Sequence, residues 1–145
     1  MSVFSSMNVA ATGMTAQQLR MDVISQNIAN ASTTRTEDGT AYRRKTVYFE
    51  EKATTSFDNI LNGYMTNYQP NGVKVTHIVE DPSDLRLVYE PDNPDANEDG
   101  YVEYPNVDTV TEMTNLIDAS RAYEANITSF NAAKTIAEKG MELFG

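Results

Sequence analysis

All five prolines of this 145-residue chain lie in its middle, and no other feature of the sequence constrains the fold as strongly. They are Pro70, Pro82, Pro91, Pro94 and Pro105. Because proline lacks a backbone N–H and clashes with the preceding turn of a helix, only the two flanks can form long uninterrupted helices. We predict one helix over about residues 2–30 and a longer one over about residues 107–143.

The first flank has apolar residues at heptad spacing, which is the pattern of a helix packed lengthwise on other helices. Two rows predict its interface: Val3, Met7, Ala10, Met14, Gln17, Met21, Ile24 and Ile28. The missing side chain of Gly13 would let a neighbouring helix approach closely. An ordinary amphipathic helix in a globular core would show the same pattern, so the heptads alone leave both interpretations open.

The second flank has two heptad rows of mixed character. The residues that they predict at its interface are Met113, Leu116, Ser120, Tyr123, Ile127, Phe130 and Met141. Ser120 and Lys134 interrupt one row. An interrupted row suits contacts with several neighbours of different character better than a single dry core.

The predicted helices are long for a chain of this size. At 1.5 Å per residue they would measure about 43 and 55 Å, whereas a compact globule of this length is about 40 Å across. We therefore expect apolar stripes that the chain itself leaves exposed. Such stripes require partners, either through oligomerisation or through ends that become ordered on assembly.

The middle of the chain is acidic and rich in strand signals. Of the formal net charge of −10, residues 35–106 contribute −7. Residues 41–49, 73–79 and 85–89 predict three short strands, and Asp38-Gly39 and Asn71-Gly72 are turn signals. The expected fold is α+β: two terminal helices packed as an antiparallel, coiled-coil-like core, and a small β-rich middle domain. The predicted segments are 1–34, 35–106 and 107–145.

Composition excludes several classes of function. The acid excess argues against nucleic-acid binding, and the absence of cysteine removes disulfides and thiolate metal sites. One histidine leaves little for general-base catalysis. No apolar run reaches the roughly 18 residues that span a bilayer. The first residues lack the basic and apolar regions of a secretory signal. We expect no enzyme, no cofactor and no stable membrane insertion.

Residues 95–100 resemble the start of a calcium loop. Asp95, Asn97 and Asp99 stand at the spacing of the first oxygen ligands, and Gly100 stands at the turn position. Position 12 of the loop, however, is Asn106 instead of glutamate, and prolines replace the helix that would precede the loop. An acidic turn leading into the second helix is favoured, and a calcium-binding module is retained as an alternative function.

Two further features have ordinary explanations. His77 is a lone histidine in an alternating strand, which is typical of a surface or packed residue, not of a catalyst. The basic triplet Arg43-Arg44-Lys45 is expected to pair with carboxylates of the chain on a solvated strand, at a small net gain in stability.

Residues 25–34 have the features of a helix C-terminus, because two asparagines are followed by a cluster of hydroxyl residues. Asn27 and Asn30 are three residues apart and so share one helix face. Their amides could hydrogen-bond to the backbone of a neighbouring segment.

The motif S-x-N-I-A-N-x-x-T at 25–33, preceded by Gly13-Met14-Thr15-Ala16-Gln17, resembles the N-terminal signature of bacterial flagellar rod and hook proteins. Residues 116–127 (LIDASRAYEANI) resemble the matching C-terminal signature. The segment 94–113 narrows the resemblance to the flagellar basal-body rod protein family, and within it to the proximal rod proteins. Another coiled-coil subunit of a type III-like secretion system would share the heptads but not these motifs.

The resemblance implies a non-enzymatic axial subunit of the flagellar rod, which transmits torque from the motor to the hook. Such a protein is exported by the flagellar type III apparatus without a cleaved signal and assembles helically in the periplasm, with its terminal helices inside and its middle outside. The implied partners are further copies, other rod proteins, a rod-base adaptor protein and the export gate. The acidic run 90–103 is not required by the signatures.

The resemblance also assigns residues. It implies an assembly motif of Ser25, Asn27, Ile28, Asn30 and Thr33, and it adds Arg121 and Asn126 to the interface of the second helix. In this family an early apolar pair spaced four apart is linked to recognition by the export gate, and Val3 and Met7 fit that spacing.

Overall fold

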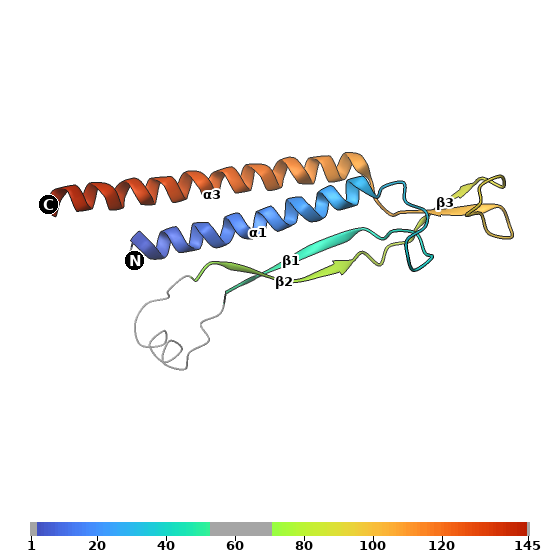
Figure 1. Cartoon of the computed structure of the whole chain (residues 1–145), viewed down its shortest axis with the longest axis horizontal. Coiled ribbons are helices and arrows are strands. Elements are labelled where there is room, and N and C mark those ends of the chain that lie inside the picture. Colours follow the sequence, from blue (N-terminus) through green and yellow to red (C-terminus); the bar gives the residue numbers. More distant parts are fainter. Residues whose placement is uncertain (1–2, 53–70, 145) are drawn as a thin grey trace, which may run out of the picture.

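The computed structural model describes residues 3–52 and 71–144, and it is elongated (Figure 1). Two long terminal helices and a small middle of antiparallel strands confirm the predicted α+β fold, and both helices match their predicted bounds to within two residues. In chain order, the elements are α1 (Val3–Ala29), β1 (Lys45–Glu51), β2 (Val73–Glu80), β3 (Arg86–Tyr89), β4 (Tyr101–Tyr104) and α3 (Thr109–Phe144).

The two helices lie side by side and antiparallel (Figure 1). Gly13 faces Asn126 near the middle of the pair, and Asn27 bonds Glu112 at one end. These two pairs belong to one antiparallel alignment of the helices, because they are the same number of residues apart on α1 and on α3. This register leaves residues 137–144, the overhang, beyond the start of α1 (Figure 1).

The α1-facing side of α3 is a row of small or polar residues seven apart. Glu112, Ala119 and Ala133 are buried, and Asn126 faces α1 between them. A Cβ atom on Gly13 would lie 2.6 Å from Asn126 Oδ1, so the close approach expected at this glycine is confirmed. The neighbour at this point is the other helix of the same chain.

The two heptad rows predicted on α3 have different environments. Leu116, Tyr123 and Phe130 are half-buried beside the row of α3 that faces α1. In the other predicted row, Met113 is 52% exposed and Met141 is 68% exposed. Within the chain, the row one position earlier packs on α1, because its smaller side chains let the helices approach closely.

α1 lies between α3 and the β1–β2 ribbon, which runs along its length (Figure 1). The ribbon therefore covers a side of α1 that α3 leaves open. With partners on two sides, α1 buries residues outside a single stripe: Ala10, Ala16, Val23, Ile24 and Asn27. Ala10 and Ile24 belong to the predicted interface, whereas Met7, Met14 and Met21 stay half-exposed.

The start of β2 is fixed against α1 through Gly72. This glycine has a φ of +87°, and a Cβ there would collide with the hydroxyl of Thr12. The same hydroxyl accepts a hydrogen bond from Val73 N at 3.1 Å and donates one to Val9 O at 2.7 Å. The turn predicted at Asn71-Gly72 is therefore also a contact point between ribbon and helix.

The strands form two separate antiparallel pairs, β1–β2 and β3–β4. β1 begins at Lys45, later than predicted, because Ala41 and Tyr42 are buried in the preceding loop. β4 was not predicted, and the acidic segment expected to be a plain turn contains both it and the loop joining it to β3. Within β4, the side chain of Val102 is fully buried.

His77 has the surface packing role expected of it. It lies opposite Tyr48 in the β1–β2 register, and the two rings stack with centroids 5.3 Å apart. Neither described helix contains a stretch long and apolar enough to cross a membrane.

The glycine contact predicts unequal effects of the same substitution at two helical positions. Gly140→Ala, where nothing lies within 4 Å of the added Cβ, should raise the free energy of unfolding by about 1 kcal/mol, the propensity difference. Gly13→Ala should lose most or all of that gain, because the Asn126 amide must move. Denaturant unfolding measures both, and equal gains would show that the helices are not in close contact at Gly13.

Candidate functional site

The end of α1, the start of β1, the loop after β2 and the first turn of α3 meet at one point, which we call the junction (Asn27, Tyr42, Arg44, Asp81 and Glu112). At its centre the Asn27 side chain is fully buried. Its Nδ2 donates to Lys45 O at 2.8 Å and to Glu112 Oε2 at 2.9 Å. Its Oδ1 accepts from Lys45 N and from the Tyr42 hydroxyl, both at 2.9 Å. Both donors and both lone pairs of the amide are thus used.

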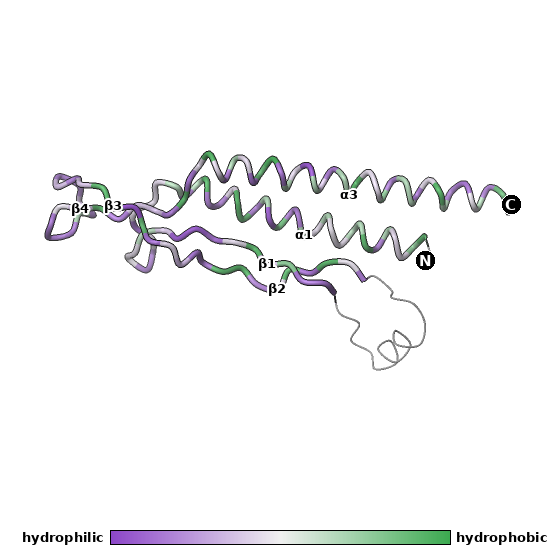
Figure 2. Tube along the Cα trace, turned by 180° about the vertical axis from the view of Figure 1, so that it is seen from behind, coloured by the Kyte–Doolittle hydropathy of each residue, from purple (hydrophilic) through white to green (hydrophobic). Residues whose placement is uncertain are grey.

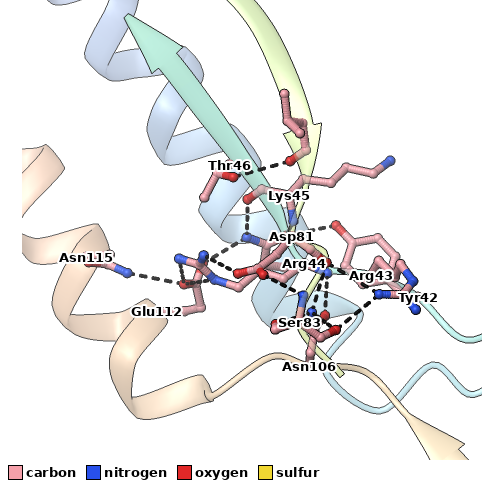
Figure 3. Close-up of polar contacts among 12 residues, drawn as sticks. Tyr42, Arg43, Arg44, Lys45, Thr46, Asp81, Ser83, Asn106, Glu112 and Asn115 are labelled. Carbon is pink, nitrogen blue, oxygen red and sulfur yellow. Dashed lines mark hydrogen bonds and ion pairs between the residues drawn. The ribbon is translucent and has the colours of Figure 1, made fainter. Parts of the chain in front are cut away.

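Glu112 brings a buried carboxylate to the junction, with only 1% of its side chain exposed. Its Oε1 accepts from Arg44 Nε at 2.9 Å and Nη2 at 2.8 Å, and from Asn115 Nδ2 at 3.2 Å (Figure 3). A buried carboxylate is tolerated when it is paired and hydrogen-bonded in this way.

Arg44 bridges two carboxylates, since its Nη1 also donates to Asp81 Oδ2 at 3.2 Å (Figure 3). The prediction that the basic triplet pairs with carboxylates of the chain is confirmed for this residue. The predicted solvated setting was wrong, because the Arg44 side chain is 22% exposed and Glu112 is buried. An ion pair withdrawn from water is costly to break, so the expected small gain does not apply here.

The electrostatics keep these groups in the states that the hydrogen bonds need. Burial raises the pKa of Tyr42, and the charges of Glu80 and Glu112 raise it further, so the phenol stays a donor. Burial acts to lower the pKa of Arg44, but Glu112 and Asp81 outweigh it and raise that pKa. The pKa of Asp81 is lowered, first by hydrogen bonds from Ser83 and then by Arg44.

A second set of hydrogen bonds holds the loop between β4 and α3. Asn106 Oδ1 accepts from Arg44 N at 2.8 Å, and its Nδ2 donates to Ser83 Oγ at 2.8 Å and to Asp81 O at 3.2 Å (Figure 3). Arg43 Nη1 donates to Ser83 O at 3.1 Å. Asn106, considered above as the last position of a calcium loop, therefore joins backbone segments.

The residues of the predicted assembly motif fall into different environments. Asn27 is the junction residue, whereas Ser25 and Asn30 bond carbonyl oxygens of their own helix, at 2.8 and 2.9 Å. Thr33 Oγ1 donates to Asn30 Oδ1 at 3.2 Å, and Ile28 is half-buried. Of the two amides expected to reach another segment, only Asn27 does so within the chain. Asn30 shapes the end of the helix.

Sequence reasoning missed the partners of Asn27. Tyr42, Lys45 and Glu112 are 15, 18 and 85 residues away from it in sequence, and no local pattern links them. Glu112 stands seven residues before Ala119 in the row that packs on α1, where a buried acid requires a partner. The predicted heptad rows did not include this row, so its burial carried no signal in the sequence.

A second candidate surface is the outer stripe of α3, formed by Val110, Met113 and Ile117. These side chains occupy successive turns and are 72%, 52% and 54% exposed. Further exposed apolar side chains lie where the helices end: Phe4, Ile136, Met141 and Leu143. Figure 2 shows apolar positions recurring along both helices. Such a row of uncovered apolar side chains is typical of an interaction surface.

In the calcium-like loop, two of the candidate ligands are occupied by the chain itself. Asp95 Oδ2 accepts from Thr34 Oγ1 at 2.8 Å, and Asp95 Oδ1 lies 3.6 Å from Arg35 Nη1. Asn97 Oδ1 accepts from the backbone amides of Asp99 and Tyr101, which closes the turn. Among residues 3–52 and 71–144, no group of three His, Cys, Asp or Glu side chains is placed to hold a metal ion.

The junction predicts a large difference between the two asparagines of the motif. Asn27→Ala leaves Lys45, Tyr42 and Glu112 with unpaired buried groups and should lower the free energy of unfolding by about 3 kcal/mol or more. Asn30→Ala removes bonds made at an exposed helix end and should cost less than about 1 kcal/mol. Chemical denaturation compares them, and similar losses would contradict the central role of Asn27.

Comparison with known proteins agrees with the resemblance drawn from the sequence. Two family profiles match: one for flagella basal body rod proteins over residues 7–35, and one for the C-terminal part of the flagellar basal body rod FlgEFG proteins over residues 98–143. The chain is 48% identical to the flagellar basal-body rod protein FlgC of Bacillus subtilis, covering 99% of both chains. It is 46% identical to FlgC of Borreliella burgdorferi and 38% to FlgC of Escherichia coli, in each case over 99% of this chain and 98% of the relative. The chain therefore belongs to the flagellar basal-body rod protein family.

Proposed function

We propose that this protein is a non-enzymatic axial subunit of the proximal rod, which self-assembles through its terminal helices and transmits torque from the motor to the hook. The observation that carries this proposal is the outer stripe of α3, which stays uncovered although the chain has packed its own helices together. Burial of such a stripe against neighbouring subunits is the main source of free energy available for assembly.

The predicted interface residues supply surfaces for several neighbours. On α1, the half-exposed Val3, Met7, Met14, Met21 and Ile28 remain free to gain contacts. On α3, Met113, Arg121 and Met141 are exposed, and the half-buried residues Leu116, Ser120, Tyr123, Asn126, Ile127 and Phe130 border the α1 contact. Different faces of one helix pair can therefore meet different subunits.

The stagger of the helices supports a contact that does not close on itself. The overhang presents Met141 and Leu143, 68% and 83% exposed, past the start of α1. In the proposal, this apolar end packs on a different surface of a neighbouring subunit. Head-to-tail contacts between unlike surfaces build helical assemblies instead of closed dimers.

In this proposal residues 1–34 and 107–145 form the assembly core and residues 35–106 face outward. The first 34 residues have no net charge, so copies can approach each other there without electrostatic repulsion. The acidic middle would repel the same region of a neighbour and is suited to the outside. The part of the proposal that concerns residues 53–70 lies outside the described residues.

The proposal places the assembled protein in the periplasmic rod, reached through the flagellar type III export apparatus. Its partners are further copies, other rod proteins, a rod-base adaptor protein and the export gate. Val3 and Met7 lie one helical turn apart at the start of α1, and both are half-exposed there. They are the residues proposed to be recognised by the gate.

Ile117→Lys tests the assembly surface. A charge in the outer stripe should abolish rod formation and motility while leaving the melting temperature within a few degrees, because Ile117 is exposed in the single chain. Ser129→Lys is the matched control: it makes an exposed position of the same helix more basic but lies away from the stripe. Motility, electron microscopy of basal bodies and export of the variant are measured together. Normal rods with Ile117→Lys, or equal defects in both variants, would contradict the proposal.

A further inference from the structure

One face of the β3–β4 pair is an uncovered patch of large side chains at the end of the molecule opposite the C-terminus (Figure 1). We call it the tip patch: Leu87, Tyr89 and Tyr101, which are 60%, 64% and 42% exposed. The register places Tyr89 opposite Tyr101, and their rings meet edge to face with centroids 5.2 Å apart. The other face of the pair holds the buried Val102, so the patch is not needed to bury the hairpin's own core.

A hollow of about 390 Å³ adjoins the tip patch, because Tyr101 also lines it. Its other side chains include Arg35, Asp95 and Glu103. Asp95 already pairs with Arg35 and Thr34. Glu103 is on the same face as the patch, opposite Leu87, and it makes no hydrogen bond or ion pair within the described residues. The hollow therefore offers one free carboxylate beside an aromatic ring.

The charge around this surface is strongly negative. Residues 81–104 contain eight acids and Arg86 as the one base, which is most of the excess of acids in the whole chain. The loop that joins β3 to β4 is hydrophilic (Figure 2). Two tips of this chain would repel each other, so a second copy meeting tip to tip does not fit the patch.

We propose that the tip patch docks a basic surface of a different protein of the rod assembly, an inference that rests on the proposed function. Leu87 and Tyr89 would pack against its apolar atoms, and a lysine or arginine would enter the hollow between Tyr101 and Glu103. The same hairpin already holds such a contact on its other face, where the Arg86 guanidinium lies 5.3 Å from the centre of the Tyr104 ring. Aromatic residues with a charged rim are typical of the centres of protein interfaces.

In vivo photocrosslinking tests the proposal. Tyr89 is replaced by the photoreactive residue p-benzoyl-phenylalanine in flagellated cells, and the crosslinked peptides are identified by mass spectrometry. The expected product joins this chain to another protein at a peptide rich in lysine or arginine. Glu103→Lys should lower its yield about tenfold, because it places like charges in contact, whereas Glu103→Asp keeps the charge and the yield. Glu103 is exposed, so unchanged melting temperatures are expected for both variants.

Other outcomes overturn the proposal. A crosslink to a second copy of this chain, a crosslink to a peptide without basic residues, a yield that Glu103→Lys does not change, or no crosslink at all would each do so. The same photoreactive residue at Ile117 reports separately on the outer stripe. A crosslink there without one at Tyr89 would leave the rod-subunit function standing and reject only the tip patch, whereas no crosslink at Ile117 would reject the function itself.

Discussion

The four hydrogen bonds of the Asn27 amide are the constraint on which the rest of the structure depends. They join the last turns of α1 to the start of β1 and, through Glu112, to the first turn of α3. Arg44 then ties the buried carboxylate to Asp81 in the loop after β2. Elements that are far apart in sequence thus meet in one polar cluster with no unpaired group on its central amide. A displacement of either helix along the other would break several buried bonds together, so the junction sets their register.

That register decides which surfaces the chain leaves open. It places the small row of α3 against Gly13 of α1, so the helices come close while larger apolar side chains stay outside. It also produces the overhang. The chain therefore has a hydrogen-bonded polar cluster, the junction, at one end of the helix pair. Its outer stripe on α3 and its overhang at the other end are apolar and largely uncovered. This division suits a subunit that keeps its own shape and gains its remaining stability from neighbours.

Much of this organisation could be predicted from local patterns, because proline placement and heptads report directly on helix length and face. The motif containing Asn27 also identified the family. The pairs that matter most could not be predicted: Arg44 with Glu112 is a contact between distant segments, and the burial of Asn27 depends on the loop at Tyr42. β4 was missed because an acidic, proline-flanked segment gives a weak strand signal. Its pairing depends on β3 and on the burial of Val102.

Native-state hydrogen exchange of the monomer tests the central claim most directly. If the junction fixes the helix pair, amide protection should be greatest at residues 23–27 of α1 and 112–119 of α3. It should decline toward Val3 and through the overhang, where the packed side chains are few and small. Uniform protection along both helices, or the strongest protection at their far ends, would contradict the account.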